Sequence, residues 1–266
     1  MMLLKEEIDT NLDTTFAGRN IVLLEEVDST NTYLRKLADK GALSGTLVTS
    51  EIQMAGKGRR GHTWISPKES NIYMSLLIRP DFAPEKSRML TLIMALAVAE
   101  AINKVTGLSS KIKWPNDIVV NNKKVTGILT EMIINGSNKP YVIIGTGINV
   151  NIEEFPDEIK DMASSLKIES GKEQNREEIV AETLNLFEKY FKEFLKTEDF
   201  SLMKCEYESL LVNRDKEVRV LGEKEPYRAV ALGIDNEGEL LVRREDGTIE
   251  KVYAGEVTVR GLYGYV

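Results

Sequence analysis

Histidine and cysteine are almost absent from this chain, which contains one of each, His62 and Cys205. A single cysteine excludes an internal disulfide framework and a cysteine-rich zinc site. A single histidine excludes a metal centre built from several histidines, and any hydrolase triad that relies on a second one. A metal held by carboxylates or by the phosphates of a ligand stays open.

Long apolar runs are also missing. Residues 1–20 are polar and acidic, without the apolar core of a signal peptide. The most apolar run, residues 89–99, is far shorter than the roughly 20 residues that a membrane span needs, and it predicts a buried core helix. We therefore expect a soluble, cytoplasmic protein with no membrane contact.

An excess of positive charge is missing as well, since the formal net charge is −7. Only about twenty residues precede the first expected strand, too few for a helix-turn-helix domain and its linker. No basic recognition helix is apparent, so we expect no DNA binding. In an acidic chain, a cluster of basic side chains indicates a focused anion site.

Such a cluster is present in the stretch Gln53-Met-Ala-Gly-Lys-Gly-Arg-Arg-Gly-His-Thr-Trp64. Glycine lets the backbone approach a ligand closely, and bare N–H groups in such a turn form a concavity suited to anions. Lys57, Arg59 and Arg60 add cationic donors for phosphate or carboxylate oxygens. The alternative is a solvated basic loop.

Hydrophobic patterning predicts an α+β fold with two domains, at residues 1–212 and 213–266. Strands and helices alternate at first, with strands expected at 21–24, 45–52 and 71–78 and helices at about 31–40, 84–105, 176–197 and up to about 212. From residue 111 the pattern indicates a hairpin-connected sheet, with strands at 118–120, 125–134 and 141–144 and turns at 121–122 and 135–136. Residues 155–172 look like a loop. Residues 216–266 hold four or five short strands, typical of a barrel of SH3 size, with turns at 235–238 and 246–247.

Further motifs carry polar groups near expected strands, each with a plainer alternative. Asp28-Ser-Thr-Asn31 precedes a helix and would serve equally as its cap. In Lys113-Trp-Pro-Asn-Asp117, the last two side chains would orient a nucleotide or a phosphate-bound magnesium ion, or would only form an Asx turn.

Strand alternation in Lys123-Lys-Val-Thr-Gly-Ile-Leu-Thr-Glu131 predicts that Lys124, Thr126, Ile128 and Thr130 share one face. A lysine on a buried face would need an anion; alternatively, Lys123 and Lys124 only flank a turn. Gly145-Thr-Gly-Ile-Asn149 has neither dinucleotide-fingerprint nor P-loop spacing, so another architecture must hold any nucleotide.

Taken in order, these motifs resemble those of the biotin–protein ligases. The matching residues are Asp28-Ser-Thr-Asn31, Gln53-x-Ala-Gly-Lys-Gly-Arg-Arg-Gly61, Lys113-Trp-Pro-Asn-Asp117, Lys124-x-x-Gly-Ile-Leu129 and Gly145-x-Gly-Ile-Asn149. The resemblance covers about residues 21–266, and it is to the monofunctional form without an N-terminal DNA-binding domain. It implies a catalytic domain related to class II synthetases and biotin–lipoate ligases, with a mixed sheet flanked by helices, followed by an SH3-like β-barrel.

The resemblance also implies a two-step reaction. The biotin carboxylate attacks the α-phosphate of ATP, giving biotinyl-5′-AMP and pyrophosphate, and a carrier-domain lysine then takes the biotinyl group and releases AMP. Biotin and ATP are substrates, no cofactor is permanently bound, and Mg²⁺ enters with the ATP phosphates, with Asp117 as its candidate neighbour. The expected partner is the biotin carboxyl carrier domain of a carboxylase. Relatives often dimerise through sheet edges, which the expected hairpins would permit.

By resemblance, the biotin-binding residues are Ser29, Thr30, Asn31, Gln53, Gly56, Lys57, Gly58, Arg59 and Lys124. The residues for ATP and the adenylate are Arg59, Arg60, Trp64, Asn116, Lys124, Gly147 and Asn149. Arg59 and Lys124 are the expected catalytic pair, because fixed cations favour the approach of two anions. The glycine-basic loop is the expected lid, since an acyl adenylate must be kept from water.

Two departures from the family pattern leave roles open. Lys57 stands where arginine is frequent and lacks its bidentate fork. His62 stands at another frequent arginine position and would be mostly neutral at pH 7, so its contact with ATP is in doubt. Trp64 would flank the nucleotide or serve as a core or hinge residue. The alternatives for the whole chain are a lipoate or octanoyl ligase of the same superfamily and, less favoured, a biotin-responsive repressor.

Overall fold

The computed structural model describes residues 2–61, 64, 66–68, 70–134, 139–221, 225–254, 258–261 and 266, apart from the side chains of Arg60 and residues 258–261. The elements up to the end of the larger sheet are α1 (Lys5–Asn11), β1 (Asn20–Val27), α2 (Thr30–Asp39), β2 (Thr46–Gln53), η1 (Arg59–Gly61), β3 (Ile72–Ile78), η2 (Pro84–Arg88), α3 (Met89–Thr106), β4 (Lys111–Lys113), β5 (Asp117–Val120), β6 (Lys123–Ile133) and β7 (Tyr141–Ile148). The remaining elements are α4 (Leu166–Ser170), α5 (Arg176–Thr197), α6 (Lys204–Leu210), β8 (Glu217–Leu221), β9 (Tyr227–Ile234), β10 (Leu240–Arg243), β11 (Ile249–Val252) and β12 (Thr258–Gly261).

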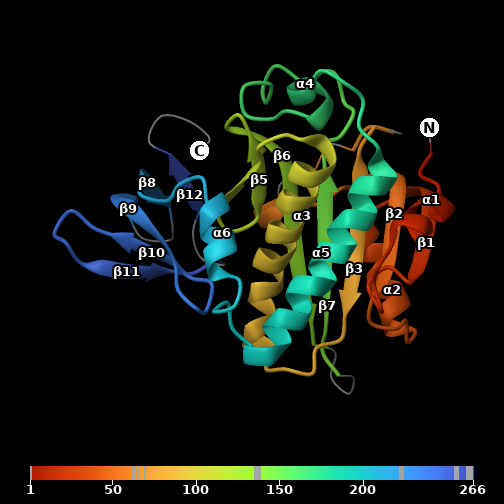
Figure 1. Ribbon diagram of the computed structural model, residues 1–266, viewed down its shortest axis with the longest axis horizontal. Helices are drawn as coiled ribbons and strands as arrows, with labels where there is room; N and C mark the ends of the chain where they lie inside the picture. The colour runs from red at the N-terminus through yellow and green to blue at the C-terminus, as the bar shows by residue number, and fades with distance from the viewer. Residues whose placement is uncertain are drawn as a thin grey trace.

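The larger sheet has seven strands in the order β1-β2-β3-β7-β6-β5-β4 (Figure 1). β1 and β2 are parallel and are joined through α2, because a tight turn cannot connect parallel neighbours. The other neighbouring pairs are antiparallel. The α+β prediction is thus confirmed, as is the hairpin-connected half from β4 to β7. Asn121 and Asn122, with φ of 48° and 64°, make the left-handed turn predicted between β5 and β6. The turn predicted at 135–136 lies outside the described residues.

The two faces of this sheet are covered by different helices. On β7, Ile144 and Ile148 belong to the large core cluster that includes α3 and α5. Their neighbour Ile143 points the other way and packs with Leu34 of α2 in a smaller cluster. Figure 1 shows α3 and α5 side by side across the strands. Side chains therefore alternate between the two faces along β7. The short helix α2 covers only part of its face, which leaves room there for a ligand pocket.

The helical segment Pro84–Thr106 is long and apolar enough, by length and composition alone, to cross a membrane. In this fold it lies in the core, since residues 92–99 of α3 are at most 2% exposed. The prediction of a buried core helix is confirmed. The helix ends at Gly107, whose φ of 75° is the left-handed conformation that glycine adopts most easily.

Two short helices were not predicted. α1 lies in the polar N-terminal segment and buries one side chain of its own, Ile8, on the side that meets α5. α4 lies within residues 155–172, which were expected to be a loop, and is capped by Ser165, whose hydroxyl accepts from the Ile168 N–H. Helices of seven and five residues are too short to show helical periodicity.

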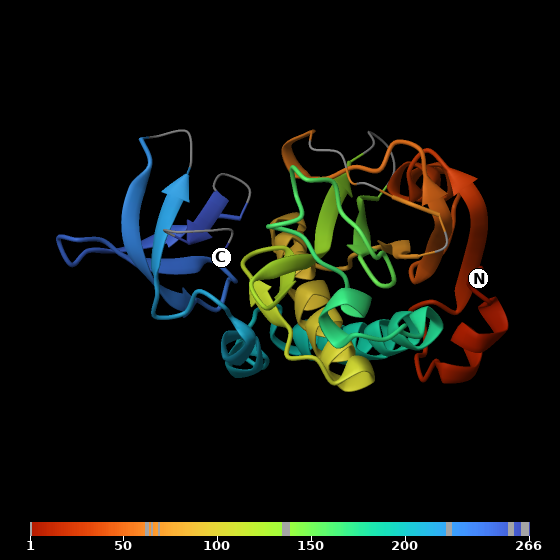
Figure 2. The same ribbon diagram turned by 90° about the horizontal axis from the view of Figure 1, so that it is seen from above.

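The smaller sheet is antiparallel, with the order β11-β10-β9-β8-β12. Its strands lie at one end of the molecule, opposite the N-terminus (Figure 2). The predicted turns are present, with Gly238 and Gly247 at φ of 77° and 87°. The C-terminal antiparallel domain predicted from the sequence is confirmed. The domain boundary between residues 212 and 213 stays a prediction; around it, Val212 N–H donates to the Ile112 carbonyl of β4, whereas Asp215 N–H donates to the Ala231 carbonyl of β9.

Specific contacts attach the smaller sheet to the rest of the chain. The Trp114 Nε1–H donates to the Gly238 carbonyl at 3.0 Å, and Arg88 pairs with Glu239 at 3.0 Å. Phe200 N–H donates to the Asn236 carbonyl at 2.7 Å. These contacts place the β9–β10 turn against the start of α3.

Candidate functional site

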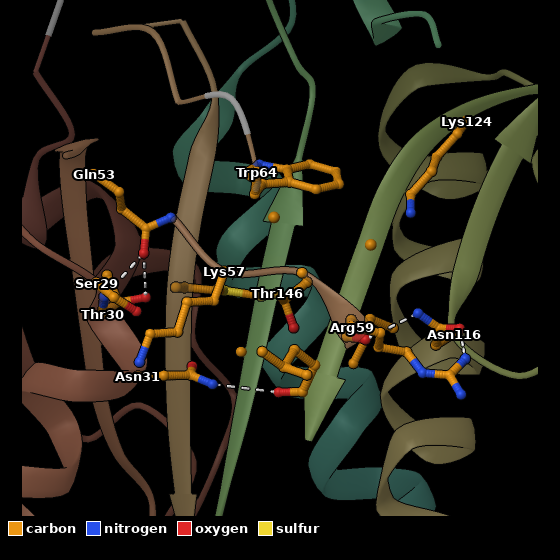
Figure 3. Close-up of a pocket in the computed structure, with 17 residues that line it drawn as sticks. Ser29, Thr30, Asn31, Gln53, Lys57, Arg59, Trp64, Asn116, Lys124 and Thr146 are labelled. Atoms are coloured by element: carbon orange, nitrogen blue, oxygen red, sulfur yellow. Dashed lines mark hydrogen bonds between the residues drawn. The ribbon is translucent and has the colours of Figure 1, made fainter. Parts of the chain in front are cut away.

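A pocket lies on the α2 side of the larger sheet, at the N-terminal end of that helix. β6 and β7 form its floor, and the loop after β2 and η1 closes over it (Figure 3). It brings together most of the predicted residues: Ser29, Thr30, Asn31, Gln53, Lys57, Gly58, Arg59, Trp64, Asn116, Lys124 and Gly147. The space left inside is about 50 Å³, enough for a few water molecules.

The remaining predicted residues lie beside the pocket or outside the described part of the chain. The Gly56 carbonyl accepts from the Trp64 N–H at 2.9 Å, which closes the loop behind the pocket. Asn149 Nδ2 donates to the Ser164 carbonyl at 3.1 Å and so ties the end of β7 to the segment before α4. The Arg60 side chain and His62 are outside the described residues. The ligand contacts of these four residues, like those of the residues that line the pocket, stay predictions.

The start of α2 is capped by a residue of strand β2. Ser29 occupies the N-cap position, but its side chain makes no capping hydrogen bond. Instead, Gln53 Oε1 at the end of β2 accepts from the Thr30 N–H at 2.9 Å. The predicted alternative named Asp28, Ser29 or Thr30 as the cap of this helix, and it is wrong for Ser29, which occupies the N-cap position. Ser29 is one of the residues that line the pocket.

A buried polar cluster extends from this helix start across the sheet. Asn31 Nδ2 donates to Glu131 Oε2 at 2.6 Å, and Asn31 Oδ1 accepts from the Ser75 hydroxyl at 2.5 Å. The Ser75 and Thr30 hydroxyls are 2.8 Å apart. Sequence reasoning missed Ser75 and Glu131. A serine within the otherwise apolar strand β3 was the available signal, since a buried hydroxyl needs a partner.

Glycines on the floor allow side chains from other elements to lie directly on the sheet. Gly127 and Gly147 are cross-strand neighbours on β6 and β7. A Cβ at either position would lie 2.7 or 2.6 Å from the Trp64 ring. A Cβ at Gly145 would lie 2.2 Å from Asn31 Oδ1. Gly147, which was predicted as a nucleotide contact, and Gly127 thus leave room for the Trp64 ring in the pocket, and Gly145 leaves room for Asn31.

The predicted face of Lys124 is wrong. Val119 pairs with Lys124 but Ile118 pairs with Thr126, so a bulge interrupts the alternation of β6. Thr130 faces α3, where its hydroxyl meets Thr91 at 2.8 Å. Lys124 Nζ instead lies 3.2 Å from the position of a Cβ on Gly127, on the pocket side. The bulge places the lysine in the pocket.

Three cations surround the pocket, each with a partner in the protein. Lys124 Nζ lies 2.6 Å from Asp117 Oδ1 and 5.4 Å from the centre of the Trp64 ring. Arg59 Nη1 donates to Asn116 Oδ1 at 2.7 Å, and its Nη2 donates to the Ala254 carbonyl of the smaller sheet's domain. Lys57 Nζ donates to Thr32 Oγ1 at 3.1 Å. Figure 3 shows Lys124 and the Arg59–Asn116 pair on the same side, away from Gln53 and Thr30.

The far end of the loop is anchored by Tyr73 of β3. Its hydroxyl donates to the Pro67 carbonyl at 3.0 Å and accepts from Asn71 Nδ2 at 3.1 Å. Burial raises the pKa of Tyr73, so the phenol stays protonated and keeps this donor. The loop is thus fixed at both ends, at Gly56 and at Pro67.

A metal site built by the protein is not evident in the described part of the chain, which contains no group of three or more His, Cys, Asp or Glu side chains that could hold an ion. Asp117, the predicted neighbour of Mg²⁺, is paired with Lys124. Any Mg²⁺ would therefore depend mainly on oxygens of the ligand.

A second cavity of about 640 Å³ adjoins the pocket. The two share Arg59, Asn116, Ile128 and Leu129. The cavity extends along β6 to Arg88 and to Ala254. The larger space therefore begins at the cationic side of the pocket, where Arg59 contacts both Asn116 and Ala254.

Comparisons with known proteins agree with this geometry. Residues 23–149 match the biotin/lipoate A/B protein ligase family, and residues 215–260 match the biotin protein ligase C terminal domain. The chain is 38% identical over 257 residues to the bifunctional ligase/repressor BirA of Bacillus spizizenii, covering 96% of this chain and 78% of that protein. It is 38% identical over 138 residues to a biotin–[acetyl-CoA-carboxylase] ligase of Paracoccus denitrificans, covering 51% of this chain and 55% of the relative. The structure of a biotin protein ligase from Aquifex aeolicus in complex with biotin and ATP is similar, with a TM-score of 0.80 and 33% identity over 91% of this chain and 99% of the other.

Proposed function

This chain belongs to the biotin protein ligase family, and on that premise we propose that it joins biotin to a lysine of a carboxylase carrier domain through biotinyl-5′-AMP. The observation that carries the proposal is the division of the pocket into two chemically different ends. Thr30, Asn31 and Gln53 offer fixed hydrogen-bonding groups at one end, and Lys124 and Arg59 offer cations at the other. Biotin has a matching polarity, with a cyclic urea at one end and a carboxylate at the other.

In the first step the carboxylate oxygen of biotin attacks the α-phosphorus of ATP, and the bond to pyrophosphate breaks. Two anions approach each other in this step, so their repulsion must be offset. Lys124 and Arg59 supply positive charge where the carboxylate and the α-phosphate would meet. Cations held in place beforehand stabilise the transition state without having to reorganise. No protein nucleophile is required.

In the second step the ε-amine of the acceptor lysine attacks the acyl carbon and AMP leaves. The mixed anhydride must survive until that lysine arrives, which requires water to be excluded. We propose that the loop from Gly56 to Trp64 is the lid. The 50 Å³ now inside the pocket is too small for biotin, so the loop and Trp64 must shift when biotin enters. Protease sensitivity of this loop that is unchanged by biotin plus ATP would count against a lid.

The nucleotide is assigned to the cationic side of the pocket. Asn116 and Arg59 lie where the pocket meets the 640 Å³ cavity, and Trp64 and Gly147 lie on the floor next to Lys124. We keep Arg60 and Asn149 as predicted contacts of ATP. Mg²⁺ would enter with the phosphates, where it would neutralise their charge. A cytoplasmic location and a homodimer are kept as predictions from the family resemblance.

The test is ATP-dependent transfer of biotin to the lysine of a purified carrier domain. Arg59→Ala and Lys124→Ala are each expected to lower the rate by 100-fold or more, because each removes a cation aimed at developing charge. Lys104→Ala is the matched control, since that lysine pairs with Glu182 on the helical side of the sheet. Full activity of both pocket variants would refute the assignment. Transfer of lipoate but not biotin would replace it with the alternative ligase of the same superfamily.

A further inference from the structure

Glu131 fixes the orientation of the Asn31 side-chain amide. An ionised carboxylate and a backbone carbonyl can only accept hydrogen bonds. Asn31 has both on one side, with Nδ2 2.6 Å from Glu131 Oε2 and 3.4 Å from the Leu129 carbonyl. The amide nitrogen must therefore face Glu131, and Oδ1 must face Ser75. Asn31 is 5% exposed, so water cannot easily replace either partner.

The orientation of Asn31 determines the next hydrogen bond. Asn31 Oδ1 has no proton, so the Ser75 hydroxyl has to donate to it across 2.5 Å. Ser75 has one hydroxyl proton, which this bond uses. The Thr30 hydroxyl then faces two acceptors, Ser75 Oγ at 2.8 Å and Gln53 Oε1 at 3.1 Å, and we assign its one proton to the nearer, Ser75 Oγ. The orientation that Glu131 imposes on the Asn31 amide thus determines which atom donates in the hydrogen bonds of Ser75 and Thr30.

At the pocket the cluster is one proton short. Thr30 Oγ1 also lies 3.1 Å from Gln53 Oε1, and the Thr30 N–H fixes the position of that oxygen. Among the described residues, three oxygen pairs lie within hydrogen-bonding distance, Asn31–Ser75, Ser75–Thr30 and Thr30–Gln53, but only two hydroxyl protons are available to them. The Thr30–Gln53 pair is therefore left without a proton between its two oxygens. Both oxygens are free to accept a hydrogen bond from a donor on the ligand.

We propose that Glu131 is a positioning residue, which keeps Thr30 Oγ1 and Gln53 Oε1 as paired acceptors for an N–H group of the ligand. The identity of that group rests on the proposed function: it is an N–H of the ureido ring of biotin. Unpaired buried acceptors disfavour a ligand that cannot donate. The acceptor pair thus selects a cyclic urea over an acid whose ring carries only sulfur and carbon.

Replacing the hydrogen-bond acceptor at position 131 with a donor tests the direction of the hydrogen bonds. In Glu131→Lys the new ammonium donates to Asn31 Oδ1, so Nδ2 turns to Ser75. Ser75 then donates to Thr30 and Thr30 to Gln53, and the missing proton is supplied by the protein. In Asn31→Asp/Glu131→Lys the aspartate accepts from both neighbours, which restores the original direction. Glu131→Gln keeps an acceptor toward Asn31.

The measurements are the dissociation constants of biotin and of ATP, taken separately by calorimetry on the full chain, together with the KM for biotin and kcat. Glu131→Lys is expected to weaken biotin about tenfold or more, the scale of one hydrogen bond, with ATP affinity unchanged. Glu131→Gln is expected within about threefold of the unmodified chain, and the double variant is expected to recover most of the biotin affinity that Glu131→Lys loses. Glu100→Lys is the control, because Glu100 accepts from Tyr190 at the same 2.6 Å but lies among the helices.

Ser75→Ala provides a second test, with a small substitution that introduces no new charge or bulk into the core. It removes one proton from the cluster and frees the Thr30 hydroxyl to donate to Gln53, so biotin binding should weaken while ATP binding does not. The inference is overturned if Glu131→Lys or Ser75→Ala binds biotin as the unmodified chain does, or if the double variant stays as weak as Glu131→Lys. An unmodified chain that binds no biotin would instead overturn the proposed function itself.

Discussion

Lys124 and Asp117 lie on neighbouring strands with Nζ 2.6 Å from Oδ1, and both side chains are largely buried. The lysine assigned to the substrate anions therefore already has a carboxylate beside it. Removal of the lysine alone would leave that carboxylate facing the same anions. The two residues must be considered together.

We predict that Lys124→Ala is more damaging than the double variant Lys124→Ala/Asp117→Asn. The single variant leaves a half-buried negative charge next to two anionic substrates, whereas the double variant removes the repulsion as well as the attraction. Biotin-dependent exchange of pyrophosphate into ATP measures the first step alone. The double variant should be about tenfold faster than Lys124→Ala, a difference of about 1.4 kcal/mol. A double variant that is slower than the single one would show that Asp117 contributes to the reaction beyond its pairing with Lys124.

Gly147→Ala is expected to weaken ATP binding through Trp64, since both residues are assigned to the nucleotide. The added Cβ would lie 2.6 Å from the indole, which is too close for the ring to stay on the floor of the pocket. We expect the dissociation constant of ATP to rise about tenfold, from a displacement of about 1–2 kcal/mol. In a Trp64→Ala background the same substitution should have little further effect, because its obstacle is gone. Equal effects in both backgrounds would contradict the contact.

The buried ion pair between Arg176 and Glu51 is expected to be a major determinant of stability. Arg176 Nη1 lies 2.9 Å from Glu51 Oε2, with side chains 5% and 3% exposed, and joins α5 to β2. Arg176→Met should lower the free energy of unfolding by about 3–5 kcal/mol, because it leaves a buried carboxylate unpaired. Urea denaturation measures this. Lys104→Met is the control, since Lys104 is 68% exposed and its pair with Glu182 should contribute about 1 kcal/mol or less. A loss for Arg176→Met no larger than for the control would be contrary to this reasoning.

Glu188 of α5 should make stability depend on acid pH. Burial raises the pKa of Glu188, but hydrogen bonds from Lys192, Thr15, Ala17 and Phe16 outweigh it and lower the pKa to about 2. A carboxylate with a lowered pKa stabilises the fold above its unfolded value of about 4.5, and this stability is lost as the pH falls toward 2. The loss should be about 2–3 kcal/mol.

Urea denaturation at a series of pH values between about 6 and 2 tests this dependence. Glu188→Gln should be less stable than the unmodified chain near pH 6, and the difference should shrink as the pH falls. Glu193→Gln is the matched control on the same helix, because its carboxylate pairs with Lys196 near the surface. A gap for Glu188→Gln that stays constant over this range would exclude the carboxylate as its cause.

Much of this protein could be predicted from patterns within short stretches of sequence. Apolar periodicity located α3 and α5, and paired asparagines located the turn between β5 and β6. The order of five motifs was specific enough to indicate the family. These features depend on neighbours along the chain, which the sequence shows directly.

Other features depended on contacts between distant segments. The bulge that turns Lys124 into the pocket depends on pairing with β5, and strand alternation alone gave the wrong face. Gln53 of β2 caps α2, whereas residues next to the helix in sequence (Asp28, Ser29 or Thr30) were the predicted caps.

The sequence by itself determined the family, the fold class and most of the residues around the pocket, because each is encoded by local residue types and their spacing. Only the tertiary structure decided how those residues are paired. It joined Glu131 to Asn31 and Lys124 to Asp117, and it placed Trp64 on Gly127 and Gly147. The direction of a hydrogen bond and the partner of a buried charge are set by atoms that approach within about 3 Å. Residues as far apart in the chain as Asn31 and Glu131 come that close only after folding.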